Sequence, residues 1–350
     1  QAEDGIRARS PSRGLGDVYK RQARDNEFYI KNLQDFVPSK IFDSHVHLYN
    51  SRHMSDHDLP EIKTPMNVDA EYFKEMMRKF LPDREIQANC FPFPRKSLDI
   101  DLANKYIAEE VEKKPGFFHQ MLISPDISAR EIRTMVEIYG FRGLKCYHLF
   151  SKHQPTQNSP IQEFLTEEQV AFANTKKMTI TLHIVKPRSL SDPENLEVIN
   201  RYAKDYPNAI IILAHAARGF NSWNTINGID SLKRYENIFF DTSAVTESGA
   251  FQAIINKFGH QRLLYGSDFP VSHIRGKCIS LADQFVWLTD ENFQNFSKRN
   301  NAHHFNELTP TLVGYESILA LKEAAVLMDL SIKDIEDVFF NNAKNIEAFQ

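Results

Sequence analysis

Two histidines separated by a single residue are the first sign of chemistry in this chain. His45 and His47 occur in the run DSHVH at residues 43–47. Alternate side chains of a β-strand point to the same side, so both imidazoles can face one metal ion if this run is a strand. The pattern alone is weak, because a chain of 350 residues with 13 histidines contains a chance His-x-His in about one case in two. Two ordinary polar residues at the end of a strand would look the same.

Three further polar residues stand where apolar runs stop. His183 ends the run TLH, His215 ends IIILAH, and Asp268 ends LLYGSD. In a barrel of parallel strands, the carboxyl ends of all strands meet at one mouth. Histidine nitrogens and a carboxylate oxygen gathered there form a ligand set suited to zinc or a similar divalent ion. Each residue alone could be an ordinary strand-end residue, but the set together favours a metal site.

The elements that would position these residues alternate between short apolar runs and helical stretches. The expected strands are Lys40–His47, Glu85–Phe91, Phe117–Ile123, Phe141–Tyr147, Met178–His183, Ala209–His215, Ile238–Thr242 and Leu263–Asp268. The helical stretches between them include Asp101–Lys113, Ala129–Tyr139, Thr166–Lys176, Pro193–Tyr206 and Gly249–Phe258. Such alternation indicates βαβ units and a parallel sheet. Eight units predict an α/β protein with the (β/α)8 TIM-barrel fold, and no G-x-G-x-x-G follows the first strand to favour a dinucleotide-binding sheet.

Two segments are too long for a minimal barrel. Residues 48–70 follow the first expected strand, and residues 269–310 follow the eighth. Both therefore leave the barrel on the face where the active site of such a fold is built. Long loops in compact domains usually serve as lids or substrate walls, so we expect both segments to border the site. The final segment, Tyr315–Phe349, is expected to form two helices that close the barrel.

The bulk composition limits the classes of partner. A net charge of −4 gives no basic surface for nucleic acid or an anionic membrane. No apolar run is long enough to span a bilayer. Cys90, Cys146 and Cys278 are an odd number without C-x-x-C spacing, which indicates a reducing compartment, and hence a cytoplasmic protein, rather than a disulfide framework. The expected partner is a small-molecule substrate, and the sequence is compatible with a homodimer.

The first residues need a separate interpretation. The run SRGLGDVYKRQ, residues 12–22, resembles the translation of an adapter used to make sequencing libraries. We therefore interpret residues 1–22 as an adapter artefact, with a disordered basic leader as the alternative. Residues 23–39 are then an N-terminal leader, and residues 40–350 are the barrel domain.

The motifs DSHVHLY, GLKCY, TLHI, LAHAARGF, FFDTSAV and LLYGSDFP occur in that order. Together they resemble the amidohydrolase superfamily, and within it the amidohydrolase-2 branch that includes aminocarboxymuconate-semialdehyde decarboxylase. The resemblance implies that His45, His47, His183 and Asp268 bind one divalent metal, with zinc expected first and manganese or iron as alternatives. It also implies that His215 orients a water molecule or polarises the substrate.

Lys145, at the end of the fourth expected strand, has three interpretations. It could be carboxylated and bridge two metals, as in two-metal relatives. It could face the substrate, as in one-metal relatives. It could also be an ordinary lysine that reaches solvent from a strand end. His148 lies close by in the sequence and could join the site, but the sequence does not decide this.

Three arginines follow strand ends: Arg95, Arg218 and Arg275. Guanidinium groups bind carboxylates or phosphates bidentately, so at least one of the three is expected to bind an anionic substrate. The alternative is that they pair with acidic side chains such as Glu247 or Asp283. Asp241 and Ser243, after the seventh strand, are expected to hydrogen-bond the site's histidines.

The ligand set predicts a metal-dependent hydrolase that uses a metal-activated water molecule on a small, anionic substrate. Asp268 and His215 would supply acid–base and electrostatic catalysis. A non-oxidative decarboxylase or a hydratase of an unsaturated carboxylic acid is the alternative in the same scaffold. A catalytically silent, metal-binding barrel is the third possibility.

Overall fold

The computed structural model describes residues 11–55, 67–112, 114–289, 302–304 and 310–350. All eight expected strands are present and lie side by side in chain order in one sheet. They are β1 (Lys40–Asn50), β3 (Glu85–Pro92), β4 (Phe117–Ile123), β5 (Gly143–Cys146), β6 (Thr179–Leu182), β7 (Ile210–Leu213), β8 (Ile238–Asp241) and β9 (Leu263–Leu264). Neighbouring strands of this set are parallel, and β2 (Asn67–Val68) adds an antiparallel pair at the end of β1.

Hydrogen bonds between β1 and the chain after β9 close the ring of strands. The amide of Ser44 donates to the carbonyl of Tyr265 at 2.9 Å, and the amide of His47 donates to the carbonyl of Phe269 at 2.9 Å. The amide of Asp268 donates back to the carbonyl of His45 at 2.9 Å. The first and last strands are therefore joined where the expected metal ligands lie.

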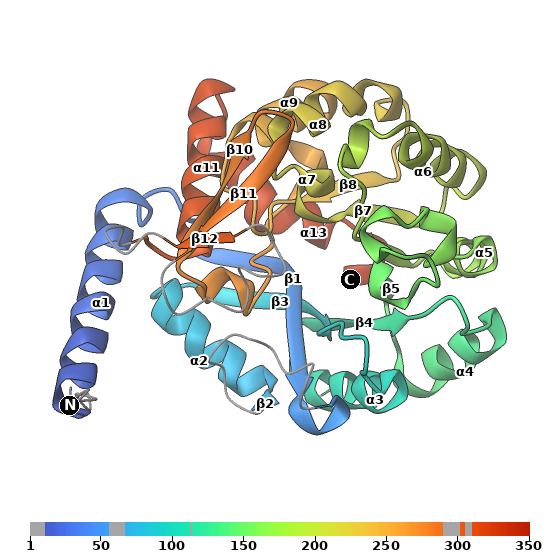
Figure 1. Ribbon diagram of the computed structural model, residues 1–350, viewed down its shortest axis with the longest axis horizontal. Helices are drawn as coiled ribbons and strands as arrows, with labels where there is room; N and C mark the ends of the chain where they lie inside the picture. The colour runs from blue at the N-terminus through green and yellow to red at the C-terminus, as the bar shows by residue number, and fades with distance from the viewer. Residues whose placement is uncertain (1–10, 56–66, 113, 290–301, 305–309) are drawn as a thin grey trace, which may run out of the picture.

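Helices surround the strands, as expected for a TIM barrel (Figure 1). They are α2 (Ala70–Phe80), α3 (Ile100–Val111), α4 (Ala129–Tyr139), α5 (Glu167–Thr175), α6 (Pro193–Asp205), α8 (Ser222–Gly228), α9 (Gly249–Phe258), α11 (Val313–Leu327), α12 (Ile332–Glu336) and α13 (Asn342–Lys344). Their ends follow from local chemistry. Ser128 and Glu131 form a reciprocal capping box on α4, and Pro193 opens α6 after the N-cap Asp192, as its sequence predicts.

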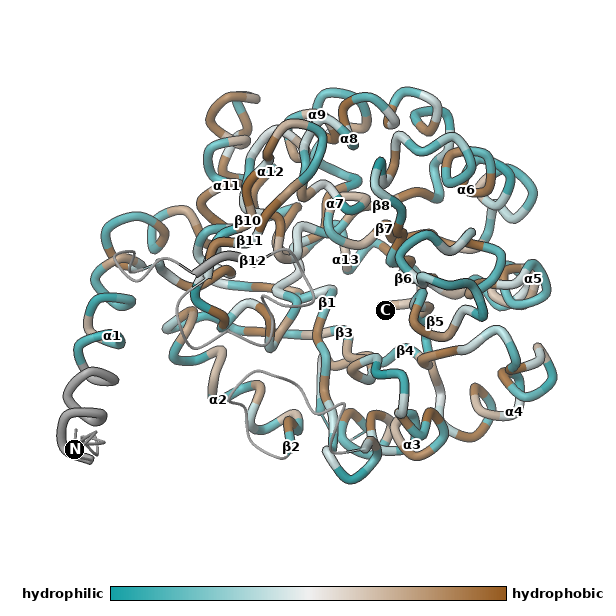
Figure 2. Tube along the Cα trace, viewed as in Figure 1, coloured by the Kyte–Doolittle hydropathy of each residue, from teal (hydrophilic) through white to brown (hydrophobic). Residues whose placement is uncertain are grey.

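Apolar strands supply the core between these helices. The strand β7, with the sequence IIIL, is among the apolar stretches in Figure 2. At the end of the barrel where the strands begin, Phe42 packs against Phe349, with ring centroids 5.1 Å apart, and the C-terminus lies inside the ring of strands in Figure 1. The expected closure of the barrel by the C-terminal segment is confirmed, although this segment contains α11, α12, a short π-helix and α13 rather than two helices.

The segment after β9 is more regular than the expected loop. It contains a small sheet of β10 (Gly276–Leu281), β11 (Gln284–Thr289) and β12 (Ala302–His304). Residues 290–301 and 305–309 of this segment, and residues 56–66 of the segment after β1, lie outside the described residues. None of the described helices is both long enough and apolar enough to cross a membrane.

Helix α1 (Pro11–Asn32) packs its C-terminal part on the barrel and extends away from it (Figure 1). Tyr29 is buried and stacks on Tyr315 of α11, with ring centroids 6.0 Å apart. The ammonium of Lys322 donates to the carbonyl of Asn32 at 2.6 Å, and Leu33 is fully buried. The segment expected to be a leader, residues 23–39, is therefore packed against α11 and shares its core.

Candidate metal centre and substrate cavity

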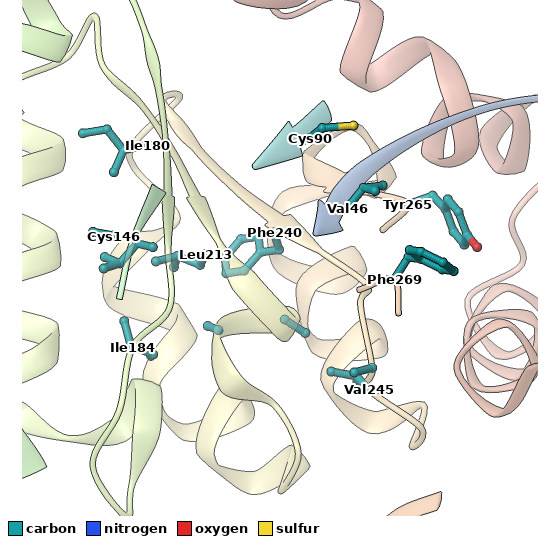
Figure 3. Close-up of a cluster of buried hydrophobic side chains, with 14 of the residues drawn as sticks. Val46, Cys90, Cys146, Ile180, Ile184, Leu213, Phe240, Val245, Tyr265 and Phe269 are labelled. Carbon is teal, nitrogen blue, oxygen red and sulfur yellow. The ribbon is translucent and has the colours of Figure 1, made fainter. Parts of the chain in front are cut away.

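The strand β1 directs His45 and His47 to the same side, as alternation in a strand requires. Val46, between them, packs on the opposite side with Cys90, Tyr265 and Phe269 (Figure 3). The pairing of β1 with β3 shifts between Asp43 and Val46, which is a β-bulge, a feature that re-aims side chains near functional sites. The two imidazoles are buried and their Nε2 atoms lie 3.3 Å apart.

Asp268 completes a triangle of donor atoms. Its Oδ1 lies 3.4 Å from Nε2 of His45 and 3.3 Å from Nε2 of His47. Asp268 has a left-handed φ of 59°, which a non-glycine residue rarely adopts outside special sites. The structure therefore brings together three of the four predicted metal ligands at the mouth of the barrel, where their side chains are buried.

The hydrogen bonds of the two imidazoles show which of their nitrogen atoms are free to bind a cation. The Nδ1 of His45 lies 2.9 Å from a carboxylate oxygen of Asp241, and the Nδ1 of His47 lies 3.1 Å from the carbonyl oxygen of Pro92. Each acceptor fixes the proton on Nδ1 and leaves a lone pair on Nε2. Burial lowers the pKa of both imidazoles, which keeps them neutral. Two lone pairs and a carboxylate oxygen thus meet within 3.4 Å.

The donor triangle fits a divalent metal. Ligand atoms about 2.0–2.2 Å from a tetrahedral zinc lie roughly 3.3–3.6 Å from one another. The three observed separations, 3.3, 3.4 and 3.3 Å, agree with that requirement. The residues present therefore fit the ion that the sequence predicts.

Asp241 and Ser243 position His45 and His215 through hydrogen bonds. Asp241 accepts hydrogen bonds from Nδ1 of His45 at 2.9 Å, from the amide of His215 at 2.8 Å and from the hydroxyl of Ser243 at 2.5 Å. Burial opposes ionisation of Asp241, but His45, His215 and Ser243 outweigh it and hold the pKa of the carboxyl below its usual range. Its charge is thus available to fix the proton of His45 on Nδ1.

His215 lies on an unusual left-handed turn after β7. His215, Ala216, Ala217 and Arg218 have φ values of 57°, 51°, 60° and 57°. Such a conformation costs roughly 1–2 kcal/mol for each residue that is not glycine, and strain of this kind clusters at functional sites. The turn places His215 and Arg218 on the same cavity. The Nδ1 of His215 donates to the carbonyl of Ser243 at 3.0 Å, and burial lowers its pKa to about 4.

The structure places His183 beside the donor triangle rather than in it. Its Nδ1 lies 3.1 Å from Nε2 of His215, and its Nε2 lies 3.2 Å from Nη1 of Arg218. Three groupings of potential ligand atoms occur among the described residues, and none of them includes His183. Two lie at this site: one joins His45 with His47 and Asp268, and the other joins His45 with His215 and Asp241. The guanidinium of Arg218 is a donor only, so it holds the lone pair of His183 on Nε2. The role of His183 as fourth ligand stays a prediction.

Lys145 is fully buried, and its amine faces His45 rather than the cavity. Its Nζ lies 3.3 Å from Nε2 of His45 and 4.4 Å from the ring centre of Phe91. The interpretation in which Lys145 reaches solvent is therefore wrong, because the strand end at this position is covered by the site itself. Burial lowers the pKa of Lys145 to about 8, and its ammonium can donate to one atom of the donor triangle.

A cavity of about 420 Å³ opens above the donor triangle. Its walls include the aromatic side chains of Phe93, Tyr147, Phe220, Phe285 and Trp287. Two of the three predicted arginines, Arg95 and Arg218, also line it. This size and lining are typical of a small-molecule site.

Arg275 is not brought to this cavity. Its guanidinium pairs with both carboxylate oxygens of Asp25 in α1, with Nη1 2.9 Å from Oδ1. The expectation that Arg275 binds the substrate anion is not supported by this position, and the alternative of an acidic protein partner describes it better. The partner is Asp25 rather than Glu247 or Asp283.

Sequence reasoning left His148 undecided, and it lines the cavity. The segment between β5 and α5 is a third long excursion from the mouth of the barrel, besides those after β1 and β9. The signal that could have identified it was the distance from Cys146 to Glu167, which is long for a βα connection.

Comparison with known proteins agrees with this architecture. Residues 42–277 match the sequence profile of the family described as Amidohydrolase. The match spans more than half of the chain, and the chain therefore belongs to the amidohydrolase family. No curated protein is similar enough in sequence to count as a match.

Solved structures show the same fold at low sequence identity. An amidohydrolase from Burkholderia multivorans with bound zinc has 12% identity and a TM-score of 0.55, covering 87% of this chain and 98% of its own. A probable 2-pyrone-4,6-dicarboxylic acid hydrolase from Acinetobacter baumannii has 14% identity and a TM-score of 0.53, covering 87% and 98%. A dihydroxybenzoic acid decarboxylase from Polaromonas sp. JS666 with bound manganese has 15% identity and a TM-score of 0.55, covering 89% and 97%. At such identities the likeness concerns the fold alone.

Proposed function

We propose that this protein is a metal-dependent hydrolase that acts on a small anionic substrate. The observation that carries the proposal is the meeting of three potential ligand atoms, on His45, His47 and Asp268, within 3.4 Å. A divalent metal held there would supply Lewis acidity and activate water as a nucleophile. Zinc is the first expectation because the ligands are mainly nitrogen, with manganese and iron as alternatives.

The chain's own residues supply the remaining parts of the reaction. Asp268 lies on the surface of the cavity and can take a proton from the attacking water and return it to the leaving group. His215 keeps a proton on Nδ1 through the Ser243 carbonyl, so its ring is held in one orientation toward the substrate. Its neighbour Arg218 offers a partly buried cation for a substrate carboxylate.

A non-oxidative decarboxylase is the second candidate. The specific observation is the likeness of fold to the Polaromonas dihydroxybenzoic acid decarboxylase, alongside the likeness to a probable pyrone hydrolase. An arginine and a metal ligand on one cavity can hold a carboxylate for either reaction. The two functions differ in their products, because only hydrolysis adds water.

A substrate panel would separate them. The zinc-loaded protein is incubated with lactones, amides and unsaturated or aromatic carboxylic acids, and products are followed by NMR together with released CO2. We expect a hydrolysed product without CO2, and no turnover by Asp268→Asn. Release of CO2 as the only reaction would replace the hydrolase with the decarboxylase. A folded protein that binds no metal and turns over nothing in the panel would contradict both.

A further inference from the structure

The segment after β5 carries a histidine that the metal chemistry does not use. It contains two 3-10 turns, η3 (His148–Phe150) and η4 (Thr156–Asn158). His148 is 6% exposed and lines the cavity. Its Nδ1 lies 3.1 Å from the hydroxyl oxygen of Thr156. The hydrogen bond with Thr156 therefore holds one side of the ring, and the ring borders the cavity.

Hydrogen bonds within the segment, and one from Lys186 after β6, fix this arrangement. The amide of Ser151 donates to the carbonyl of His148 at 3.0 Å, and the hydroxyl of Ser151 donates to Glu163 at 3.1 Å. The amide of Lys186 donates to the carbonyl of Gln157 at 2.8 Å. Because both 3-10 turns are held in this way, the contact between His148 and Thr156 does not depend on a substrate.

His148 and Arg218 both contact His183. Its ring stacks on His183 at a centroid distance of 5.8 Å and an angle of 29°. The guanidinium of Arg218 contacts Nε2 of the same His183 at 3.2 Å. None of the metal-ligand groupings among the described residues contains His148.

Arg218 lacks an acidic partner in the described part of the chain. No ion pair among the described residues includes it, and its Nε is buried without a hydrogen-bond acceptor. The side chain is partly buried, and a guanidinium withdrawn from water in this way is stabilised when an anion pairs with it. The side chains of Arg218 and His148 both border the cavity, so a substrate group there can meet both.

We propose that His148 and Arg218 form one subsite for a substrate carboxylate, with Thr156 as the positioning residue. We assign the ring proton of His148 to Nε2, with the Thr156 hydroxyl donating to Nδ1 across the 3.1 Å contact. In this tautomer Nε2 donates to the carboxylate beside the charged fork of Arg218. The aromatic walls of Phe285 and Trp287 favour a flat, apolar body attached to that carboxylate. Calling the ligand a substrate rests on the proposed hydrolase function, whereas the subsite itself does not.

Benzoate is the probe for this subsite, because it combines a carboxylate with an aromatic ring. Trp287 lines the cavity, so its fluorescence reports binding in a Trp223→Phe background that removes the exposed second tryptophan. Titrations use the full chain, both zinc-loaded and after chelation. We expect benzoate to bind both forms, and His148→Phe to weaken binding about tenfold, the effect of losing one hydrogen bond to a charged group.

Matched variants separate the subsite from a general loss of structure. His153→Phe removes an exposed histidine of the same segment, with 38% of its side chain accessible, and should leave benzoate binding unchanged. Thr156→Val should weaken binding, and Thr156→Ser should restore it because the hydroxyl remains. The zinc content of His148→Phe should equal that of the unsubstituted protein.

Three results would overturn the inference: no benzoate binding by the unsubstituted chain, unchanged affinity in His148→Phe, or binding that requires zinc and ignores His148 and Arg218. If Thr156→Val bound benzoate as tightly as the unsubstituted chain, this would contradict the role of Thr156 in positioning His148. Failure of the hydrolase proposal has a different signature. Benzoate binding that depends on His148 in a protein without metal or turnover would contradict the function and leave the subsite in place.

Discussion

The carboxylate oxygen Oδ1 of Asp268 lies 3.3 Å from Nε2 of His47, the imidazole nitrogen that faces away from the Pro92 carbonyl. The Nδ1 of His47 is committed to the carbonyl of Pro92, so its Nε2 offers only a lone pair. Repulsion between two such atoms in a buried site is relieved by a cation. This pair therefore connects the backbone geometry of β1 and of the turn after β9 to metal binding.

The variants Asp268→Asn and His215→Asn should both abolish turnover but differ in metal content. Asp268 belongs to the donor triangle, so its loss should weaken metal binding as well. His215 lines the same cavity but is not part of the triangle, so His215→Asn should retain the metal. His183→Asn should lose it if His183 is the fourth ligand. Metal analysis of the purified variants checks this, with the exposed Asp283→Asn as control. If His215→Asn lost as much metal as His183→Asn, this would contradict the assignment of His215 as a residue that does not bind the metal.

The three arginines should separate into two groups. Arg95→Ala or Arg218→Ala should lower kcat/KM, because a charged hydrogen bond to the substrate is lost. The decrease should correspond to about 1.5–3 kcal/mol of transition-state stabilisation. Arg275→Ala should leave kcat/KM unchanged and lower the free energy of unfolding by about 1–2 kcal/mol, because its partly buried pair with Asp25 is broken. Steady-state kinetics and urea unfolding measure the two effects. Normal kinetics in all three variants would contradict an anionic substrate.

Acid should destabilise the protein partly through His273. Burial lowers the pKa of His273 to about 4, compared with about 6.5 in an unfolded chain. Between these values the unfolded state binds a proton that the folded state does not, so stability falls as the pH falls from about 6.5 to 4. The loss from this group is on the order of 3 kcal/mol, and it is absent above that window.

The variant His273→Asn should lose less stability than the unsubstituted protein over the same pH range. Urea unfolding at several pH values measures the difference. His153→Asn, which removes an exposed histidine, is the control and should follow the unsubstituted protein. An identical pH dependence for His273→Asn would show that this imidazole is not held neutral by the fold.

Truncation should separate the two parts of the N-terminal region. Deletion of residues 1–22 should change the free energy of unfolding by less than about 1 kcal/mol, since the described side chains of residues 20–24 are exposed. Deletion of residues 1–32 should cost several times more, because it removes the buried Tyr29 and the Asp25 partner of Arg275. Thermal and urea unfolding compare both forms. A large effect of the shorter deletion would contradict the interpretation of residues 1–22 as dispensable.

The sequence predicts the barrel well because each strand is a short apolar run that ends in a turn signal. The same logic places His45, His47 and Asp268 together, since parallel strands end at one mouth. The pairing of Arg275 could not be predicted in this way. Its partner Asp25 is 250 positions away in the chain, and only the packing of α1 on α11 brings them together.

Local backbone conformation also lies beyond sequence patterns. The four left-handed residues after β7 turn Arg218 toward His183, and no glycine in the run His215–Arg218 announces such a turn. Similarly, His148 reaches the cavity because two 3-10 turns fold the segment after β5 back on itself. Periodicity describes regular elements and gives no position for side chains on irregular segments.

The metal content of the full chain tests the central claim most directly. The protein is loaded with zinc, freed of unbound metal by gel filtration and analysed by mass spectrometry, with turnover measured on the same sample. We predict about one equivalent of zinc, lost in His47→Asn and kept in the exposed-site control His153→Asn. A folded chain that holds no divalent metal yet turns over its substrate, or a His47→Asn variant that keeps its zinc, would contradict the account.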